Sequence, residues 1–208
     1  CNKQNNKKYK NVNAGYRYEG SDPNNYIQME KSDRTTEMWR IIGLFPDGVN
    51  GENVIRVRRH YEKNNYPTMA FNSKNENYWA STSMYSTLKD IYSLSNYKNT
   101  VNYKMYLGTM SSYTTLTAEG WYKAERGSVN GKICSSGDGC NDTVTRITSW
   151  TGYIALPYVT DYAYASGEDD CNTKIDKSSA NKCKNNNWMF KPNTWYWTLS
   201  PDALSGSS

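Results

Sequence analysis

The stretch of sequence that decides the fold is residues 152–201, GYIALPYVTDYAYASGEDDCNTKIDKSSANKCKNNNWMFKPNTWYWTLSP. Two runs rich in aromatic and β-branched residues flank a polar loop that Cys171 and Cys183 bracket. Such residues prefer strands, so both runs are predicted to be strands. A cysteine-bracketed loop between buried strands is typical of proteins that fold in an oxidising, extracellular environment.

The composition around this stretch favours one domain built mainly of strands and turns. The chain has 208 residues, of which only 37% are hydrophobic, but 19 Tyr and 7 Trp supply large rings that can be buried. The net charge of +5 is spread along the chain, which argues against a nucleic-acid partner. No apolar run approaches the roughly 20 residues of a membrane span, so membrane contact is expected only through an N-terminal lipid.

The five cysteines allow two local disulfides and leave one cysteine over. Pairing Cys134 with Cys140 and Cys171 with Cys183 is the simplest connectivity, although the sequence alone leaves others open. No CxxC is present and the chain has one histidine, so a metal site is not expected. Cys1, followed by a polar stretch, resembles the lipid-bearing start of a bacterial lipoprotein, but it equally fits a chain boundary that happens to fall at a cysteine.

The remaining elements follow from local patterns. We expect short strands over 16–18 and 26–29, a hairpin of 38–45 with 53–57, and Trp121–Lys123 in extended form. Helical spacing predicts a helix over 83–94 and a weaker one over 101–110. Alternation places Arg56 and Arg58 together on the solvent face of a strand.

The order of the motifs resembles a family of secreted Gram-positive bacterial surface domains. The motifs are GYRYEGSDPNNYI (15–27), EMWRIIGLFPDG (37–48), YVTDYAYASG (158–167), NNNWMF (185–190) and WYWTLSP (195–201). The resemblance implies an α+β, C-type-lectin-like fold, similar to that of sulfatase-modifying factors, with short antiparallel strands, one or two helices and long disulfide-closed loops. It implies a polar tether over 1–13 and one extracellular domain over 14–208.

Two departures from the family pattern stand out. Thr160 and Ala163 occupy positions where the family tends to have Ser and Gly. The family continues past its WTxSP-like strand into further strands, which this sequence does not show. We therefore expect a domain without its final strand, whose open sheet edge could pair with another chain.

Candidate contacts gather in the same closing stretch. Tyr162, Tyr164 and Tyr196 are candidate members of an exposed recognition surface, because tyrosine rings give contact area at low entropic cost, and Trp188 is a further candidate. Trp195, Trp197 and Leu199 alternate onto one strand face that is predicted to be core. Glu168 and Asp169 form an acidic loop for which solvation is favoured over a Ca²⁺ site.

No constellation for catalysis is visible, and the only histidine, His60, is expected at the surface. The sequence therefore predicts a non-enzymatic adhesion or recognition module at the bacterial cell surface, binding a protein or a glycan. The alternative is a subunit of a self-assembling surface filament or pilus-like appendage. An extracellular hydrolase comes third, because no carboxylate pair stands out at strand ends.

Overall fold

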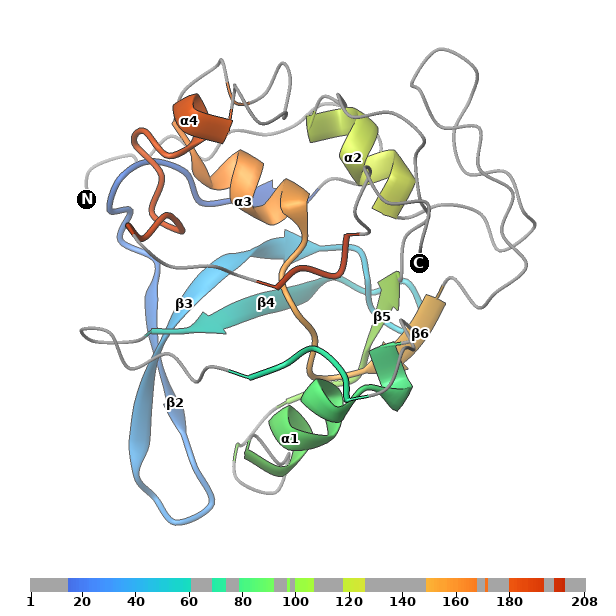
Figure 1. Ribbon diagram of the computed structural model, residues 1–208. Coiled ribbons are helices and arrows are strands. Elements are labelled where there is room, and N and C mark those ends of the chain that lie inside the picture. Colours follow the sequence, from blue (N-terminus) through green and yellow to red (C-terminus); the bar gives the residue numbers. More distant parts are fainter. Residues whose placement is uncertain are drawn as a thin grey trace.

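The longest strand of the computed structural model, β3 (Thr36–Phe45), lies at the centre of an antiparallel sheet. Three strands pair with it, namely β1 (Tyr16–Arg17), β2 (Tyr26–Glu30) and β4 (Val54–Arg59) (Figure 1). The structure describes residues 15–60, 69–73, 79–91, 97, 100–106, 118–125, 149–167, 171, 180–192 and 197–200. The predicted strands near 16 and 26 and the hairpin of β3 with β4 are confirmed.

Gly43 brings β1 close to β3. A Cβ at this position would lie 2.2 Å from the carbonyl oxygen of Tyr16, far inside van der Waals contact. The register of β3 against β4 also shifts between Ile41 and Gly43, where β3 is irregular. The glycine in the WRIIGLF motif is therefore required by backbone packing.

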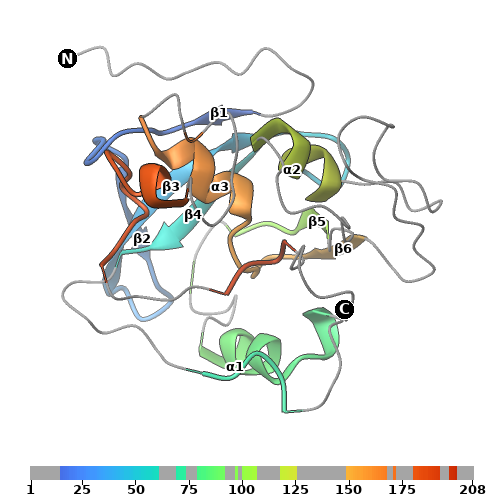
Figure 2. The same cartoon turned by 45° about the horizontal axis from the view of Figure 1, so that its top comes forward.

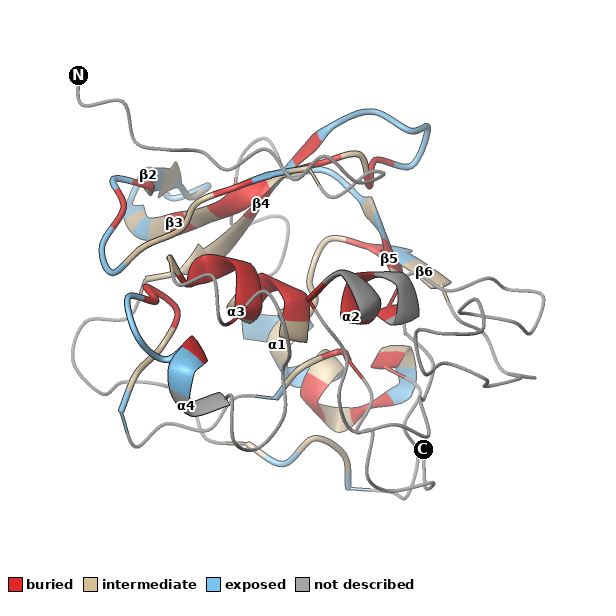
Figure 3. Ribbon diagram, turned by 90° about the horizontal axis from the view of Figure 1, so that it is seen from above, coloured by how far each residue is buried: buried red, intermediate tan, exposed pale blue. Residues whose placement is uncertain are grey.

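Helices cover one face of this sheet, which we call the inner face. α3 (Val159–Ala165) lies over it beside α2 (Ala118–Glu125), and the short α4 (Ala180–Cys183) follows (Figure 1). Figure 3 shows α3 as an almost continuously buried layer against the sheet. The molecule therefore has a sheet layer and a helix layer. α3 belongs to the helix layer and lies directly against the sheet (Figure 3).

A second group of elements lies beyond one end of the sheet (Figure 2). It contains the two-stranded sheet of β5 (Tyr103–Tyr106) and β6 (Ser149–Gly152), the 3₁₀-helix η1 (Trp79–Ser81) and α1 (Ser83–Ile91). α1 confirms the helix predicted from residue 83. Thr82 starts it, because its Oγ1 accepts the Tyr85 backbone N–H at 3.1 Å.

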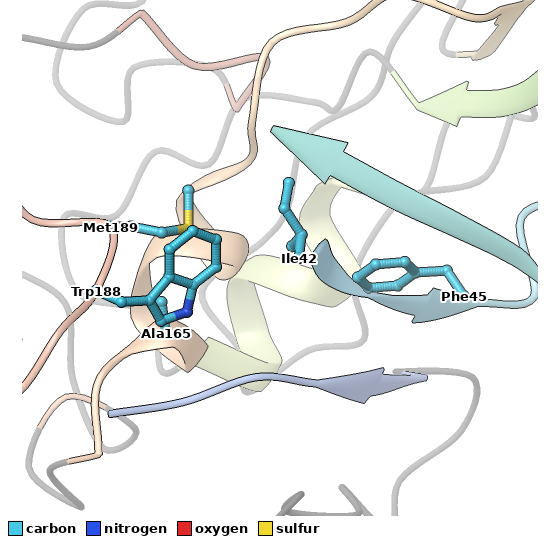
Figure 4. Close-up of a cluster of buried hydrophobic side chains, with 5 residues drawn as sticks. All are labelled: Ile42, Phe45, Ala165, Trp188 and Met189. Atoms are coloured by element: carbon cyan, nitrogen blue, oxygen red, sulfur yellow. The ribbon is translucent and has the colours of Figure 1, made fainter. Parts of the chain in front are cut away.

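Two buried clusters hold these elements together. The first lies between the sheet and the helix layer, where Figure 4 shows its five side chains: Ile42, Phe45, Ala165, Trp188 and Met189. The second joins η1 and α1 to the start of α3, and its buried members are Trp79, Met84, Tyr158 and Leu199. Both clusters combine residues far apart in sequence, so they form only when the whole domain folds.

Three expectations about local structure are wrong. The segment expected to form a weak helix over 101–110 contains strand β5, and Trp121–Lys123, expected to be extended, lies in α2. The first aromatic run of the closing stretch contains helix α3 instead of a strand. Its alternating tyrosines suggested period two, but α3 is buried on most of its surface, so its sequence lacks the polar stripe that identifies a surface helix.

Two expectations about side-chain placement are also wrong. Arg56 is buried on the inner face, because it pairs with a buried carboxylate described below, whereas it was expected to be solvated. Trp197 is 54% exposed, whereas it was expected in the core with Leu199, which is buried. Residues 197–200 do not form a strand, so alternation does not govern which of them is buried.

The fold class is α+β, as the sequence predicts. The finer likeness to C-type lectins stays a prediction.

Candidate recognition site

The inner face of the sheet carries three buried arginines, and each guanidinium lies over two aromatic rings. Arg17 lies 4.6 Å from the Phe45 ring centre and 4.9 Å from that of Tyr164. Arg56 lies 3.6 Å from the same Phe45 ring and 5.4 Å from Tyr158. Such contacts stabilise a cation that has lost water, by about 2 kcal/mol or more when the pair is desolvated.

Asp161 on α3 is the anion between two of these arginines. Its Oδ1 accepts hydrogen bonds from Arg17 Nη1 at 2.5 Å and from Arg56 Nη2 at 2.8 Å, and its side chain is fully buried. Its Oδ2 accepts the Tyr158 backbone N–H at 3.0 Å at the start of α3. A single carboxylate therefore attaches the helix to both β1 and β4.

A second buried carboxylate, Glu125 of α2, lies on the other side of the α3 N-terminus. Its two oxygens accept the Thr160 backbone N–H at 3.2 Å and the Thr160 hydroxyl at 2.5 Å. Ser200 donates its hydroxyl to the same carboxylate at 2.5 Å. These bonds satisfy polar groups that burial would otherwise leave without partners.

Two of the predicted contact residues belong to this interior. Tyr164 and Trp188 are buried, and both rings stack on arginines, Trp188 on Arg40 at 4.6 Å. The expectation that Tyr164 lies on an exposed surface is therefore wrong, because its ring is a partner of Arg17. Tyr162 is half-buried and packs against the first cluster and against a further buried cluster formed by Ala118, Ala163, Tyr164, Cys171 and Cys183.

The remaining predicted positions divide between one confirmed pair and residues that the structure does not describe. Cys171 and Cys183 form the expected disulfide, and the structure places both in the interior. Tyr196, Glu168, Asp169, Cys134, Cys140 and Cys1 lie outside the described residues.

The arrangement that reaches the surface is centred on Tyr26, a residue that the sequence reasoning did not select. Its ring is 40% exposed and lies 4.4 Å from the Arg40 guanidinium. The ring of His60 meets it edge-on, with centroids 5.3 Å apart. Met38, also exposed, accepts the His60 backbone N–H through its carbonyl oxygen on the next strand.

Asp22 fixes the orientation of this ring. Its Oδ1 accepts the Tyr26 hydroxyl at 2.9 Å and Arg40 Nη2 at 3.0 Å, while 69% of its side chain is exposed. Arg40 also donates through Nε to Asn25 Oδ1 at 2.8 Å. Asp22, Tyr26 and Met38 are exposed and His60 is half-buried, and we name these four residues the Tyr26 surface.

Burial and neighbouring charges shift the pKa of the Tyr26 phenol and of the Arg40 guanidinium that lies against its ring. Burial and the hydrogen bond to Asp22 raise the pKa of Tyr26, so the phenol is protonated at neutral pH. Burial lowers the pKa of Arg40, and the nearby Tyr26 and Asp22 oppose that shift. The uncharged Tyr26 phenol therefore donates a hydrogen bond to the Asp22 carboxylate.

The signal for this surface was present in the DPNNY turn and the WR dipeptide. Asp22 and Tyr26 come from the first motif, and Arg40 from the second. Nothing local in the sequence shows that Arg40, 18 residues from Asp22, lies against this turn.

Comparison with known proteins gives no identification: no family model, no curated protein and no solved structure matches this chain. Within the parts of the chain that the structure describes, no helix combines the length and hydrophobicity needed to cross a membrane. The resemblance to Gram-positive surface domains accordingly stays a prediction.

Proposed function

We propose that this chain is a non-enzymatic extracellular recognition module that binds a glycan or protein through the Tyr26 surface. The main support for this proposal is the exposed Tyr26 ring, which the buried Arg40 and the carboxylate of Asp22 hold in one orientation. A ring fixed before binding loses little entropy when a ligand covers it.

Three further features support this proposal. The buried Cys171–Cys183 disulfide fits an oxidising, extracellular environment. The Tyr26 surface combines the exposed carboxylate of Asp22, the exposed Met38 and the half-buried imidazole of His60, which suits contact with a ligand that has both polar and apolar parts. Arg40, which lies against the Tyr26 ring, is itself held by Asn25 and by the Trp188 ring, so the ring has a well-anchored partner.

The test uses binding of the purified chain to a glycan array and to immobilised glycoproteins before and after enzymatic deglycosylation. We expect Tyr26→Ala to reduce binding at least about tenfold, the loss expected when an aromatic anchor is removed. Tyr16→Ala is the matched control, because Tyr16 is also an exposed tyrosine, at 47%. It takes no part in the inner-face contacts, which its neighbour Arg17 makes.

Four outcomes decide between the possibilities. Loss of binding to deglycosylated targets identifies a glycan ligand, and its retention identifies a protein ligand. Equal binding by the Tyr26 and Tyr16 variants, or no binding to any probe, would overturn the proposal.

A further inference from the structure

The inner face of the sheet continues past the helix layer on the hairpin of β2 and β3, which extends beyond α3 and α4 (Figure 1). The strand register pairs Tyr26 with Arg40, Gln28 with Met38 and Glu30 with Thr36. Alternate residues of a strand share a face, so all six side chains lie on the face that carries Arg40. Five of them are exposed, and we name these five the hairpin strip: Tyr26, Gln28, Glu30, Thr36 and Met38.

The other face of the same hairpin is more deeply buried. Ile27, Met29 and Trp39 alternate with the residues of the strip, and all three are half-buried. The Trp39 ring meets the ring of the buried Tyr97 edge-on, with centroids 5.6 Å apart. The hairpin is therefore supported from behind and presents the strip to solvent.

The strip offers side-chain groups to a ligand, because side chains stand out from the face of a sheet whereas its backbone groups lie in the plane. Tyr26 supplies an aromatic ring, whose electron-rich face suits C–H groups. The Gln28 amide and the Thr36 hydroxyl can each donate and accept hydrogen bonds, and Met38 adds an apolar contact. A sugar has this combination of hydroxyl groups and C–H groups.

The charges beside the strip favour a neutral ligand. Arg40 Nη2 lies 3.0 Å from Asp22 Oδ1, so the carboxylate next to the Tyr26 ring is already compensated. A cationic group placed on this ring would meet the Arg40 guanidinium, which lies 4.4 Å from the ring centre. An anionic ligand would meet the carboxylates of Asp22 and Glu30, one near each end of the strip.

The dimensions of the strip favour a glycan chain over a folded protein. Its three residue pairs extend about 14 Å along the strands, and two strands are about 10 Å wide. The area is therefore on the order of 150 Å², whereas each partner of a stable protein–protein interface buries about 800 Å². A narrow, elongated face of this size matches a ligand that is itself a chain.

We propose that the hairpin strip binds a linear, neutral glycan. One sugar stacks on the Tyr26 ring, and the following sugars lie over Gln28 and Met38 toward Thr36. The inference deepens the recognition function of the Tyr26 surface and rests on it, because both use the Tyr26 ring. It adds Gln28 and Thr36 as specificity-determining residues and names the ligand class.

The first test measures the affinity of the full chain for oligosaccharides of increasing length by isothermal titration calorimetry. The neutral probes are ladders of glucose, mannose and N-acetylglucosamine oligomers, and the anionic probe is a ladder of galacturonic acid oligomers. We expect affinity for at least one neutral ladder to rise about threefold to tenfold from the disaccharide to the longest member, which is what one or two added hydrogen bonds contribute. The anionic ladder should bind more weakly at every length.

Two variants and a matched control locate the binding. Gln28→Ala should remove the gain with length but keep the affinity for the disaccharide, whereas Tyr26→Ala should lower the affinity for every member. Ser32→Ala is the control, because Ser32 is exposed on the turn of the same hairpin but lies outside the strip. It should bind as the wild-type chain does.

A second measurement on the wild-type chain keeps the proposal decidable if a variant does not fold. The longest neutral oligosaccharide is added while NMR follows the Gln28 side-chain amide and the methyl groups of Met38 and Ile55. We expect the first two signals to shift. Ile55 should not respond, because it is 58% exposed but alternates with Arg56 and so lies on the opposite face of the sheet.

The results distinguish failure of this inference from failure of the recognition function. Affinity that does not change with length, stronger binding of the anionic ladder, or no binding of any neutral ladder would overturn the hairpin strip. If the chain then binds a protein target and Tyr26→Ala abolishes that binding, the recognition function stands and only the ligand class is wrong. If no target is bound through Tyr26, both proposals are wrong.

Discussion

The guanidinium of Arg56 donates to the carboxylate of Asp161 at 2.8 Å, and both side chains are buried although 105 residues separate them in sequence. This contact joins β4 to α3 and therefore fixes the helix layer against the inner face of the sheet. The same carboxylate oxygen also accepts from Arg17 on β1, so one anion serves two cations. Loss of that anion leaves two buried positive charges side by side.

Asp161→Asn should therefore destabilise the domain by about 3–5 kcal/mol, the range found when one partner of a buried ion pair is removed. Urea unfolding, followed by tryptophan fluorescence, measures the change. Asp22→Asn is the matched control and should cost less than about 1 kcal/mol, because the Asp22 side chain is mostly exposed. Similar losses in both variants would contradict the role assigned to Asp161.

Gly43→Ala should destabilise the sheet by about 1–3 kcal/mol, because the added methyl group meets the Tyr16 carbonyl oxygen and the backbone must shift. Thermal unfolding gives the change in stability. Gly51→Ala separates crowding from backbone conformation: Gly51 has a positive φ of 84° but open space around its Cβ position. Gly51→Ala should therefore lose stability only through backbone strain. Amide hydrogen exchange should show that β1 stays paired with β3 in this variant.

Removal of the disulfide by the double substitution Cys171→Ser and Cys183→Ser should cost about 2–4 kcal/mol, mainly because the unfolded chain gains freedom. Peptide mapping without reductant should recover the two cysteines in one linked fragment, and a thiol reagent should not label them, since their sulfurs are joined in a disulfide. Labelling of either cysteine in denaturant without reductant counts against the structure.

Asp22→Asn should lower the pKa of Tyr26 toward its ordinary value, because the hydrogen bond to Asp22 is one of the causes of the raised pKa. NMR of ring-labelled tyrosine, assigned with Tyr26→Phe, follows the titration. A raised pKa means that the unfolded phenol ionises first, so Tyr26 contributes stability below pH 10.0 that is lost as pH rises further. Tyr85, whose pKa burial also raises, should not respond to the change at Asp22.

Glu37 provides the opposite pH dependence at the acid end. Burial opposes its ionisation, but hydrogen bonds from Lys31 and Tyr97 and the charge of Arg59 outweigh burial and lower its pKa. Its contribution to stability is present above the ordinary pKa of a glutamate and is lost as pH falls through the lowered value. In Glu37→Gln, the free energy of unfolding should depend less on pH between about pH 5 and pH 3, the range in which ordinary carboxylates titrate.

The sequence determined those features that local rules control. The β3–β4 hairpin, the helix from Ser83 and the pairing of Cys171 with Cys183 follow from alternation, helical spacing and short separation along the chain. The α+β class follows from the same patterns, because the β3–β4 hairpin and α1 already supply both kinds of element.

Only the tertiary structure decided where the closing stretch 152–201 places its aromatic and charged side chains. The expected exposed ring of Tyr164 became a partner of Arg17, and Arg56, expected in solvent, became buried, because a carboxylate on a distant helix compensates its charge. The Tyr26 surface likewise needs Arg40, His60 and Asp22 from separate parts of the chain. Burial of charge depends on partners that only the complete fold brings together, and no local pattern encodes them.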